Sequence, residues 1–240
     1  MLTCSHVLCK VDSIADAVRD FEDLGFTMEW GSDPDRAHNA LLWFTDGPFI
    51  EFFELPRAVA LLRWPFAAAY GGPAGERLAR WAGPGEGWRD LALETESTDL
   101  TEARAALLAA GVPVSRLIRG KRTRPDGAPV RYQFLAPRPA SLPFVVSAYD
   151  PPQRPAQVTH ANGAKGIARV RMGVADADRS SFDALIGDHD RWLTVEPAAR
   201  TGVLAVELDG LESELDTDKL HGGALIASPA SPASATREEA

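Results

Sequence analysis

A glutamate stands in the middle of the apolar sequence "DGPFIEFFEL", which covers residues 46–55. A short run that is apolar on both faces is typical of a strand covered on each side, and Glu51 interrupts this run. Burying an unpaired carboxylate costs several kcal/mol, so such a group is normally paired, protonated or bound to a metal ion. Glu51 is therefore the first candidate for a functional residue.

A second group with chemical potential is a cluster of basic side chains beside the turn sequence "RPDG" (124–127). Its members are Arg119, Lys121, Arg122 and Arg124. Arginine binds carboxylate and phosphate groups through paired hydrogen bonds, so one of these residues could hold an anionic substrate. A solvated loop is the commoner use of such a run. Arg122 and Arg124 are the substrate-binding candidates.

Length and charge limit the classes of partner. The chain has 240 residues, with 25 basic and 34 acidic side chains and a formal charge of −9. This length suits one large domain or two small ones. The acidic excess argues against nucleic acid or an anionic membrane as the main partner. The longest apolar stretch, at 57–70, is interrupted by Arg63 and Pro65 and is too short to span a bilayer. We expect a soluble protein.

The two cysteines indicate a reducing compartment. Cys4 and Cys9 are five residues apart in one predicted strand, so we expect them on opposite faces and without a disulfide. The first residues lack the basic and apolar regions of a signal peptide. The expected location is the cytoplasm.

The elements that must position Glu51 follow the order β-α-β-β-β. Strands are predicted at 6–11, 26–30, 38–44 and 49–55, and a helix runs from its N-cap Ser13 to Gly25. The helix has an apolar stripe, and one face of the first strand should cover it. The stripe is Ile14, Val18 and Phe21, and the covering residues are Val7, Cys9 and Val11.

The same order of elements recurs later in the chain. Strands are predicted at 88–96, 112–120, 130–136 and 142–150, with a helix at 100–111. The helix caps Ser13 and Asp99 are 86 residues apart, and so are the terminating glycines Gly25 and Gly111. Matching offsets at both ends of a helix indicate an internal repeat.

The repeat divides the chain into segments. Residues 1–55 and 86–150 form two β-α-β-β-β modules, and residues 56–85 connect them. Residues 151–226 are expected to form a linker and a partial third module. Residues 227–240 are expected to be a disordered tail, because repeats of Ser, Pro and Ala bury little apolar surface.

Paired modules with a polar residue in the first strand and "IE" in the fourth resemble the glyoxalase/bleomycin-resistance/dioxygenase superfamily, also called vicinal oxygen chelate. More narrowly, "HVLCKVDSIADAVRDFEDLGF", "HNALLWF", "FIEFFEL", "RPDG", "LPF" and "HANGAKGI" resemble the bacterial glyoxalase-like domain family. The resemblance covers most of residues 2–210. It implies an α+β fold in which paired β-α-β-β-β modules form a concave sheet around a cavity, with a partial third module.

The resemblance also implies a divalent metal ion held by the first and last strands of each module. His6 and Glu51 occupy the two positions of the first module, and an imidazole with a carboxylate suits Fe, Mn, Zn or Ni. In the second module the counterpart of Glu51 is Val146. The counterpart of His6 is Asp90 if the apolar faces are aligned, or Ala92 if the helix offset is carried through. At most three of the four positions are competent, which leaves metal dependence open.

Three further residues complete the candidate site. His38, at the start of the third strand, is a substitute metal ligand. Asn39 aligns with a family position and could donate to a substrate carbonyl, although it could equally close a turn. Lys10 shares the predicted strand face of His6.

Three functions are compatible with these residues. The first is a metal-assisted lyase or isomerase that acts on a carbonyl or enediolate-forming substrate, with Glu51 moving a proton. The second is a metal-free protein that binds and sequesters a small compound, which the missing second-module ligand favours. The third, an extradiol dioxygenase, has the least support because it needs two histidines and a carboxylate at iron. A homodimer is compatible with each.

Overall fold

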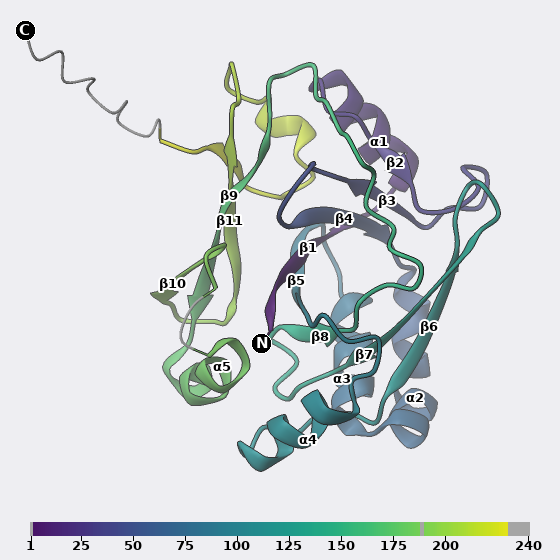
Figure 1. Cartoon of the computed structure of the whole chain (residues 1–240), viewed down its shortest axis with the longest axis vertical. Helices are drawn as coiled ribbons and strands as arrows, with labels where there is room; N and C mark the ends of the chain where they lie inside the picture. The colour runs from purple at the N-terminus through teal and green to yellow at the C-terminus, as the bar shows by residue number, and fades with distance from the viewer. Residues whose placement is uncertain (1, 188–189, 230–240) are drawn as a thin grey trace, which may run out of the picture.

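The computed structural model describes residues 2–187 and 190–229 of the chain. The strands form one sheet of eight and one sheet of four. Figure 1 shows the larger sheet strongly curled, with the smaller sheet beside it. The predicted α+β class, built from β-α-β-β-β modules, is confirmed.

The first module has the predicted order of elements. They are β1 (Thr3–Val11), α1 (Ile14–Asp23), β2 (Glu29–Trp30), β3 (Asn39–Leu42) and β4 (Phe49–Glu54). The Ser13 hydroxyl accepts a hydrogen bond of 3.2 Å from the Asp16 N–H and so caps α1. Gly25 has a φ of +84° just beyond the helix, a conformation that glycine adopts without strain.

The connector and the second module follow. The connector holds a 3₁₀ helix η1 (Arg57–Leu62) and the helices α2 (Arg63–Tyr70) and α3 (Gly72–Trp81). The second module comprises β5 (Gly87–Glu94), α4 (Thr101–Ala109), β6 (Ile118–Thr123), β7 (Pro129–Leu135) and β8 (Phe144–Val146).

One strand lies later in the sequence than predicted. The strand expected at 112–120 forms only from Ile118, because Val112 and Val114 are buried in the core beside α4. Strand β6 then continues through Arg122, which pairs with Val130 of β7. A basic segment expected to be loop thus becomes the outer strand of the large sheet.

Strand register decides which positions of the two modules correspond. In the large sheet the strand order is β2-β3-β4-β1-β5-β8-β7-β6, and the modules meet where β1 and β5 pair antiparallel. His6 pairs with Phe49 in the first module, as Ala92 pairs with Phe144 in the second. Glu51 lies two residues after Phe49, as Val146 lies two after Phe144. The counterparts of His6 and Glu51 are therefore Ala92 and Val146, and the alignment through Asp90 is wrong.

The small sheet repeats this arrangement in reduced form. Its elements are β9 (Gly166–Val174), η2 (Asp176–Asp178), α5 (Arg179–Ile186), β10 (Leu193–Pro197), β11 (Gly202–Asp209), η3 (Thr217–Lys219) and β12 (Leu225–Ala227). The order β10-β9-β11-β12 has parallel outer pairs and an antiparallel central pair, as β4-β1-β5-β8 does. The small sheet therefore has strands in the positions of β4, β1, β5 and β8, whereas the sequence indicated only a partial third module.

The end of the small sheet bears on the predicted tail. Ala227 belongs to β12, and the Ser228 N–H donates a 2.8 Å hydrogen bond to the Leu208 carbonyl. The first residues of the segment 227–240 are therefore paired rather than disordered. Residues 230–240 lie outside the described residues.

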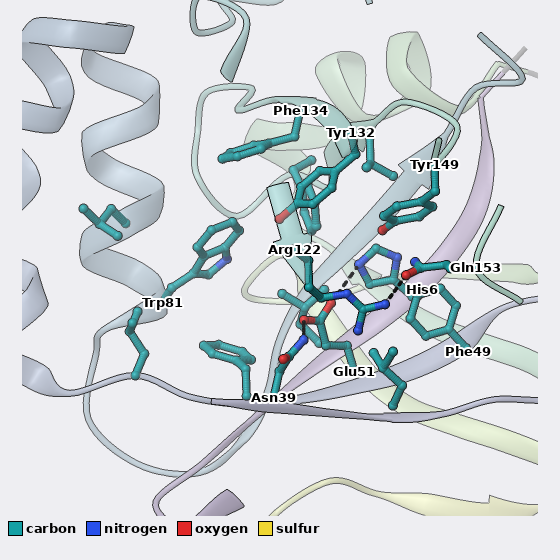
Figure 2. A pocket seen from close by; sticks show the side chains of 17 residues that line it. His6, Asn39, Phe49, Glu51, Trp81, Arg122, Tyr132, Phe134, Tyr149 and Gln153 are labelled. Carbon is teal, nitrogen blue, oxygen red and sulfur yellow. Dashed lines mark hydrogen bonds and ion pairs between the residues drawn. The ribbon is translucent and has the colours of Figure 1, made fainter. Parts of the chain in front are cut away.

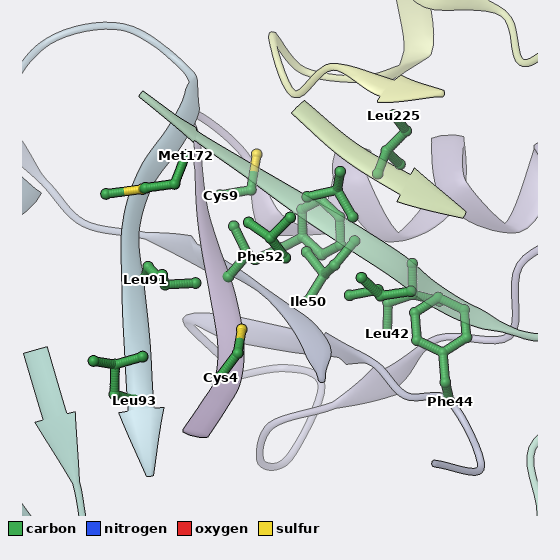
Figure 3. Packing of buried hydrophobic residues seen from close by; sticks show 14 of the residues in the cluster. Cys4, Cys9, Leu42, Phe44, Ile50, Phe52, Leu91, Leu93, Met172 and Leu225 are labelled. Atoms are coloured by element: carbon green, nitrogen blue, oxygen red, sulfur yellow. The ribbon is translucent and has the colours of Figure 1, made fainter. Parts of the chain in front are cut away.

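The main core lies between the convex face of the large sheet, helix α1 and the small sheet (Figure 3). The face of β1 predicted to cover the helix does so, since its three residues and the helix stripe belong to one buried cluster. The small sheet contributes Val170, Met172 and Val206 to the same cluster. The opposite, concave face of β1 is left free for a cavity.

The cysteines depart from the predicted alternation. Cys4 and Cys9 are free, as expected, but both are buried in the main core (Figure 3). The pairing of β1 with β5 shifts by one residue between Cys4 and His6, and this irregularity brings Cys4 to the convex side. The prediction that the two thiols lie on opposite faces is wrong.

The sequence "HANGAKGI" joins the small sheet to the first module. His160 Nδ1 accepts a 3.0 Å hydrogen bond from the Thr27 N–H, and its Nε2 donates to the Trp43 carbonyl at 3.0 Å. Burial lowers the pKa of His160, which keeps the ring neutral for this pair of bonds, although the Trp43 carbonyl opposes that shift. Asn162 donates to the Leu24 carbonyl at 2.8 Å.

No helix within the described ranges has both the length and the apolar character needed to cross a bilayer.

Candidate active site

The concave face of the large sheet forms a cavity of about 310 Å³ (Figure 2). This volume lies at the small end of the range for ligand pockets. Both modules supply its wall, together with helix α3 and the segment that follows β8.

The structure brings half of the predicted site residues into this cavity. Those that line it are His6, Asn39, Glu51 and Arg122. Those that the cavity wall does not include are Lys10, His38, Asp90 and Arg124.

Glu51 is held by a neighbour on the adjacent strand. The Asn39 side-chain amide donates a 2.8 Å hydrogen bond to Glu51 Oε1. This approach depends on Gly31, because a Cβ at that position would lie 1.9 Å from Asn39 Oδ1. Burial raises the pKa of Glu51 above its ordinary value, while the Asn39 bond and the charge of Arg122 oppose the shift. The carboxyl group is therefore oriented, and its protonation state is sensitive to what enters the cavity.

His6 is a neutral imidazole between aromatic rings. Its ring stacks on Phe49 with 4.6 Å between centroids and meets the edge of Phe144 at 5.7 Å. Burial lowers the pKa of His6 to about 3. Nδ1 lies 3.1 Å from the Ser5 hydroxyl, which donates to Glu94 Oε2 at 2.6 Å. Since the hydroxyl proton is used there, the Ser5 oxygen accepts from His6 Nδ1–H, and Nε2 keeps a free lone pair.

That lone pair faces the carboxylate. His6 Nε2 lies 3.5 Å from Glu51 Oε2. With a neutral ring the contact is not an ion pair, and two acceptors at this distance repel each other. A proton on Glu51, a donor group of a ligand or a cation between the two atoms removes the repulsion. The pair is therefore a site for a proton or another electrophile.

The donor set does not fit a four-ligand metal centre. His6 and Glu51 provide two ligands, and their second-module counterparts are Ala92 and Val146. In residues 2–187 and 190–229 no group of three or more His, Cys, Asp or Glu side chains is placed to hold a metal ion. An extradiol iron centre would need a second histidine. Two side chains alone rarely hold a metal tightly.

Asp90 has a different role from the one predicted. It is buried and forms an ion pair with the buried Arg77 of α3. The same oxygen, Oδ2, accepts a 2.6 Å hydrogen bond from the Trp81 indole N–H, and Oδ1 accepts from the Leu91 N–H at 2.9 Å. Asp90 therefore joins α3 to β5 and fixes the ring of Trp81, which lines the cavity.

Three other candidates lie away from the cavity wall. Lys10 is buried, and its ammonium group is 3.4 Å from both Asp12 Oδ1 and the Gly85 carbonyl. Arg124 pairs with Asp126 at 3.4 Å. His38 is exposed just before β3.

Arg122 supplies positive charge to the cavity. Its Nη1 donates to the Gly31 carbonyl at 3.1 Å, and its Nη2 donates to the Gln153 side chain. Among the described residues it takes part in no ion pair, although its charge acts on Glu51 from within the cavity. Figure 2 shows the guanidinium group between Glu51 and Gln153.

The remaining wall is aromatic. Trp81, Phe134 and Phe144 form a group with 5.6–6.3 Å between ring centroids. In Figure 2 Trp81 and Phe134 lie on the left, and His6, Arg122 and Gln153 lie toward the right. The cavity therefore has an apolar half and a polar half.

Several residues of this wall were not predicted from the sequence. Tyr132 and Phe134 alternate in β7, so period two could have placed them on one face. Burial raises the pKa of the Tyr132 and Tyr149 phenols, which keeps them neutral hydrogen-bond donors. Gln153 lies in a segment without periodicity, and no local signal marked it.

The pKa of His6 predicts a pH-dependent stability. Above pH 6.5 the imidazole is neutral in the native and the unfolded chain. Below pH 6.5 the His6 imidazole of the unfolded chain is protonated, whereas that of the native protein stays neutral down to about pH 3. The free energy of unfolding therefore decreases as the pH falls between these two values. The loss from one such site reaches about 1.4 kcal/mol per pH unit. We expect His6→Gln to lose stability less steeply than the wild type between pH 6.5 and 4.5 in urea unfolding. Parallel curves for the two proteins would contradict this assignment.

The comparisons with known proteins agree with this fold. A family model described as "Glyoxalase-like domain" matches residues 4–184. No curated protein is similar enough in sequence to match. A hypothetical protein from Staphylococcus aureus has a TM-score of 0.61 at 12% identity, covering 89% of this chain and 93% of that one. The Mn(II)-bound glyoxalase from Novosphingobium aromaticivorans has a TM-score of 0.51 at 14% identity, covering 91% and 67%.

A third solved structure, the 2,3-dioxygenase LapB from Pseudomonas sp. KL28, has a TM-score of 0.50 at 11% identity, covering 88% of this chain and 75% of that one. At these identities the similarity concerns the fold alone. The function must be argued from the cavity.

Proposed function

Because the chain belongs to the glyoxalase-like domain family, we propose that it is a small-molecule enzyme in which Glu51 removes a proton from a carbon atom next to a carbonyl group. This is the proton transfer of a lyase or isomerase. The observation that carries the proposal is the 3.5 Å distance between Glu51 Oε2 and His6 Nε2 at the cavity, with Nε2 assigned as unprotonated from the bond of Nδ1 to Ser5. No other carboxylate is among the described residues that line it.

Each polar group has a part in this reaction. Ionised Glu51, oriented by Asn39, takes the proton on Oε2. The neutral ring of His6 then accepts a hydrogen bond from the protonated carboxyl group, which replaces the repulsion between the two acceptors. The negative charge that develops on the carbonyl oxygen is stabilised by the field of Arg122 and by donor phenols such as Tyr149. The apolar wall limits the entry of water.

A divalent metal ion would use the same two residues, His6 and Glu51, and would polarise the carbonyl group. Because the donor set offers two ligands, no step of the proposed reaction depends on a metal ion. We expect elemental analysis of protein purified without a metal-affinity tag to show well below one equivalent of Fe, Mn, Zn or Ni. We further expect EDTA to leave activity unchanged. One equivalent of metal, lost together with activity on chelation, would contradict this expectation.

The reaction itself can be tested by isotope exchange. The protein is incubated in D₂O with a panel of small ketones, aldehydes and 2-oxo acids, and the loss of protons next to the carbonyl group is followed by proton NMR. We expect exchange above the buffer rate for at least one class of compound. The absence of exchange for every compound that binds would refute the proposal.

A second function is favoured by the largely apolar wall and by Ala92 and Val146 at the second-module positions. In this alternative the protein binds and sequesters a small compound without changing it. The exchange experiment separates the two functions, because a binding protein would bind members of the panel without exchanging their protons.

A further inference from the structure

We propose that the compound this cavity accepts is an aryl-substituted carboxylate, with its carboxylate on Arg122 and its ring against Trp81, Phe134 and Phe144. Such a ligand would occupy the site described above. The reaction of this ligand rests on the proposed function, whereas its binding rests on the cavity alone.

Arg122 places a positive charge in the cavity wall. The guanidinium group is half-buried, and within the described residues no carboxylate pairs with it. Its hydrogen bonds to the Gly31 carbonyl and to Gln153 use two of its five N–H groups and hold its plane. The remaining N–H groups can form the paired hydrogen bonds that a planar carboxylate accepts. A carboxylate ligand would give this half-buried cation a direct partner.

Glu51 limits where a second negative charge can lie. The ligand carboxylate must contact Arg122 while avoiding ionised Glu51, so it belongs on the Gln153 side of the guanidinium group (Figure 2). This placement leaves the carbon chain of the ligand to pass Glu51, which needs a C–H group as its partner in the proposed reaction. A cationic ligand is disfavoured by Arg122 itself.

The apolar half of the cavity selects the other end of the ligand. Trp81 and Phe144 lie 5.6 Å apart in an edge-to-face arrangement, and Phe134 lies about equally close to both. The Trp81 indole N–H is already bonded to Asp90, so the ring offers apolar surface to a ligand. Aromatic rings favour contact with further aromatic rings in these geometries. A polar sugar or a phosphate chain would leave this half without suitable contacts.

The size of the cavity sets an upper limit. A volume of about 310 Å³ accommodates a single ring with a short side chain and excludes a nucleotide-sized ligand from full enclosure. The ligand class is thus a one-ring compound in which a short chain joins the ring to the carboxylate.

The experiment uses the full chain and three small probes. 3-Phenylpropanoate carries the proposed groups, 3-phenylpropanamide lacks the charge, and propanoate lacks the ring. Affinities are measured by calorimetry for the wild type, for Arg122→Gln and for Arg124→Gln. The last variant is the matched control, because Arg124 pairs with Asp126 and does not line the cavity. Circular dichroism checks that each variant is folded.

We expect the wild type to bind 3-phenylpropanoate roughly 10- to 100-fold more tightly than either other probe. The amide loses the charge-assisted contact with Arg122, and propanoate loses the contact with the aromatic wall. Arg122→Gln should reduce the preference for the acid over the amide to within about twofold, and Arg124→Gln should retain it. Equal affinity for acid and amide in the wild type, or an unchanged preference in folded Arg122→Gln, would overturn the proposal.

The two proposals fail in different ways. Phenylpyruvate, which adds a carbonyl group beside the carboxylate, is tested for proton exchange in D₂O. Tight binding of both aryl acids without exchange would support the ligand class and count against the proposed reaction. Exchange of other carbonyl compounds, together with no binding of either aryl acid, would overturn the ligand class and support the reaction.

Discussion

Replacing Glu51 by glutamine is expected to lower the maximal rate of proton exchange by about 10²- to 10⁴-fold, the range that a positioned general base contributes. Glutamine has nearly the same shape and can still accept the hydrogen bond from Asn39, but it cannot take a proton. The variant should remain folded and should keep its ligand affinity within a few-fold, because the aromatic wall and Arg122 are unchanged. The measurements are the NMR exchange rate at saturating ligand and a calorimetric affinity.

The pH profile adds a second readout. Burial raises the pKa of Glu51 above the ordinary 4.5, and the base must be ionised, so wild-type exchange should rise with pH through that raised value and then level off. Glu54→Gln is the matched control, since Glu54 lies in the same strand and bonds the Ile14 N–H at the start of α1. A Glu51→Gln variant that exchanges protons at the wild-type rate would show that another group is the base.

Replacing Asp90 by asparagine is expected to lower the free energy of unfolding by about 3–5 kcal/mol, the cost of leaving one member of a buried ion pair without its partner. Arg77 is about 1% exposed, and within the described residues its hydrogen bonds go to Asp90 and to the carbonyl groups of Pro137 and Leu142. Without the carboxylate its charge stays buried with no anionic partner. Denaturant unfolding with an unchanged m-value is the measurement.

The control for Asp90 is an exposed pair of the same type. Asp183 pairs with Arg179 on the surface of α5, four residues apart, and Asp183→Asn should change stability by no more than about 0.5 kcal/mol. A loss below about 1 kcal/mol for Asp90→Asn would show that Arg77 finds other partners. A bound metal ion that Asp90→Asn releases would instead restore Asp90 as a ligand.

Local patterns in the sequence determined the modules. Ser13 and Gly25 mark the two ends of α1 by hydrogen-bonding and backbone rules that act within a few residues. Period-two alternation placed His6 on the face opposite Val7, and the repeated offset of 86 residues indicated two copies. His6, Asn39 and Glu51 could be placed together because all three belong to one module.

The second half of the site depended on contacts between distant segments. Only the pairing of β1, β5 and β8 showed that Ala92, and not Asp90, corresponds to His6, because a shift of one strand by two residues keeps the same apolar face. Arg122 lines the cavity because β6 extends to Thr123, beyond the segment that the sequence predicted as strand. Gln153 reaches Arg122 from a segment without periodicity.

Register and loop paths are set by the packing of whole strands against each other. A local pattern predicts the face on which a side chain lies, but it does not predict which residue of another strand lies opposite. The partner of a buried charge depends on this pairing between distant segments. For this reason the sequence indicated that Glu51 needed a partner, and only the tertiary structure decided that Asn39 holds it, that neutral His6 faces it, and that Asp90 belongs to Arg77.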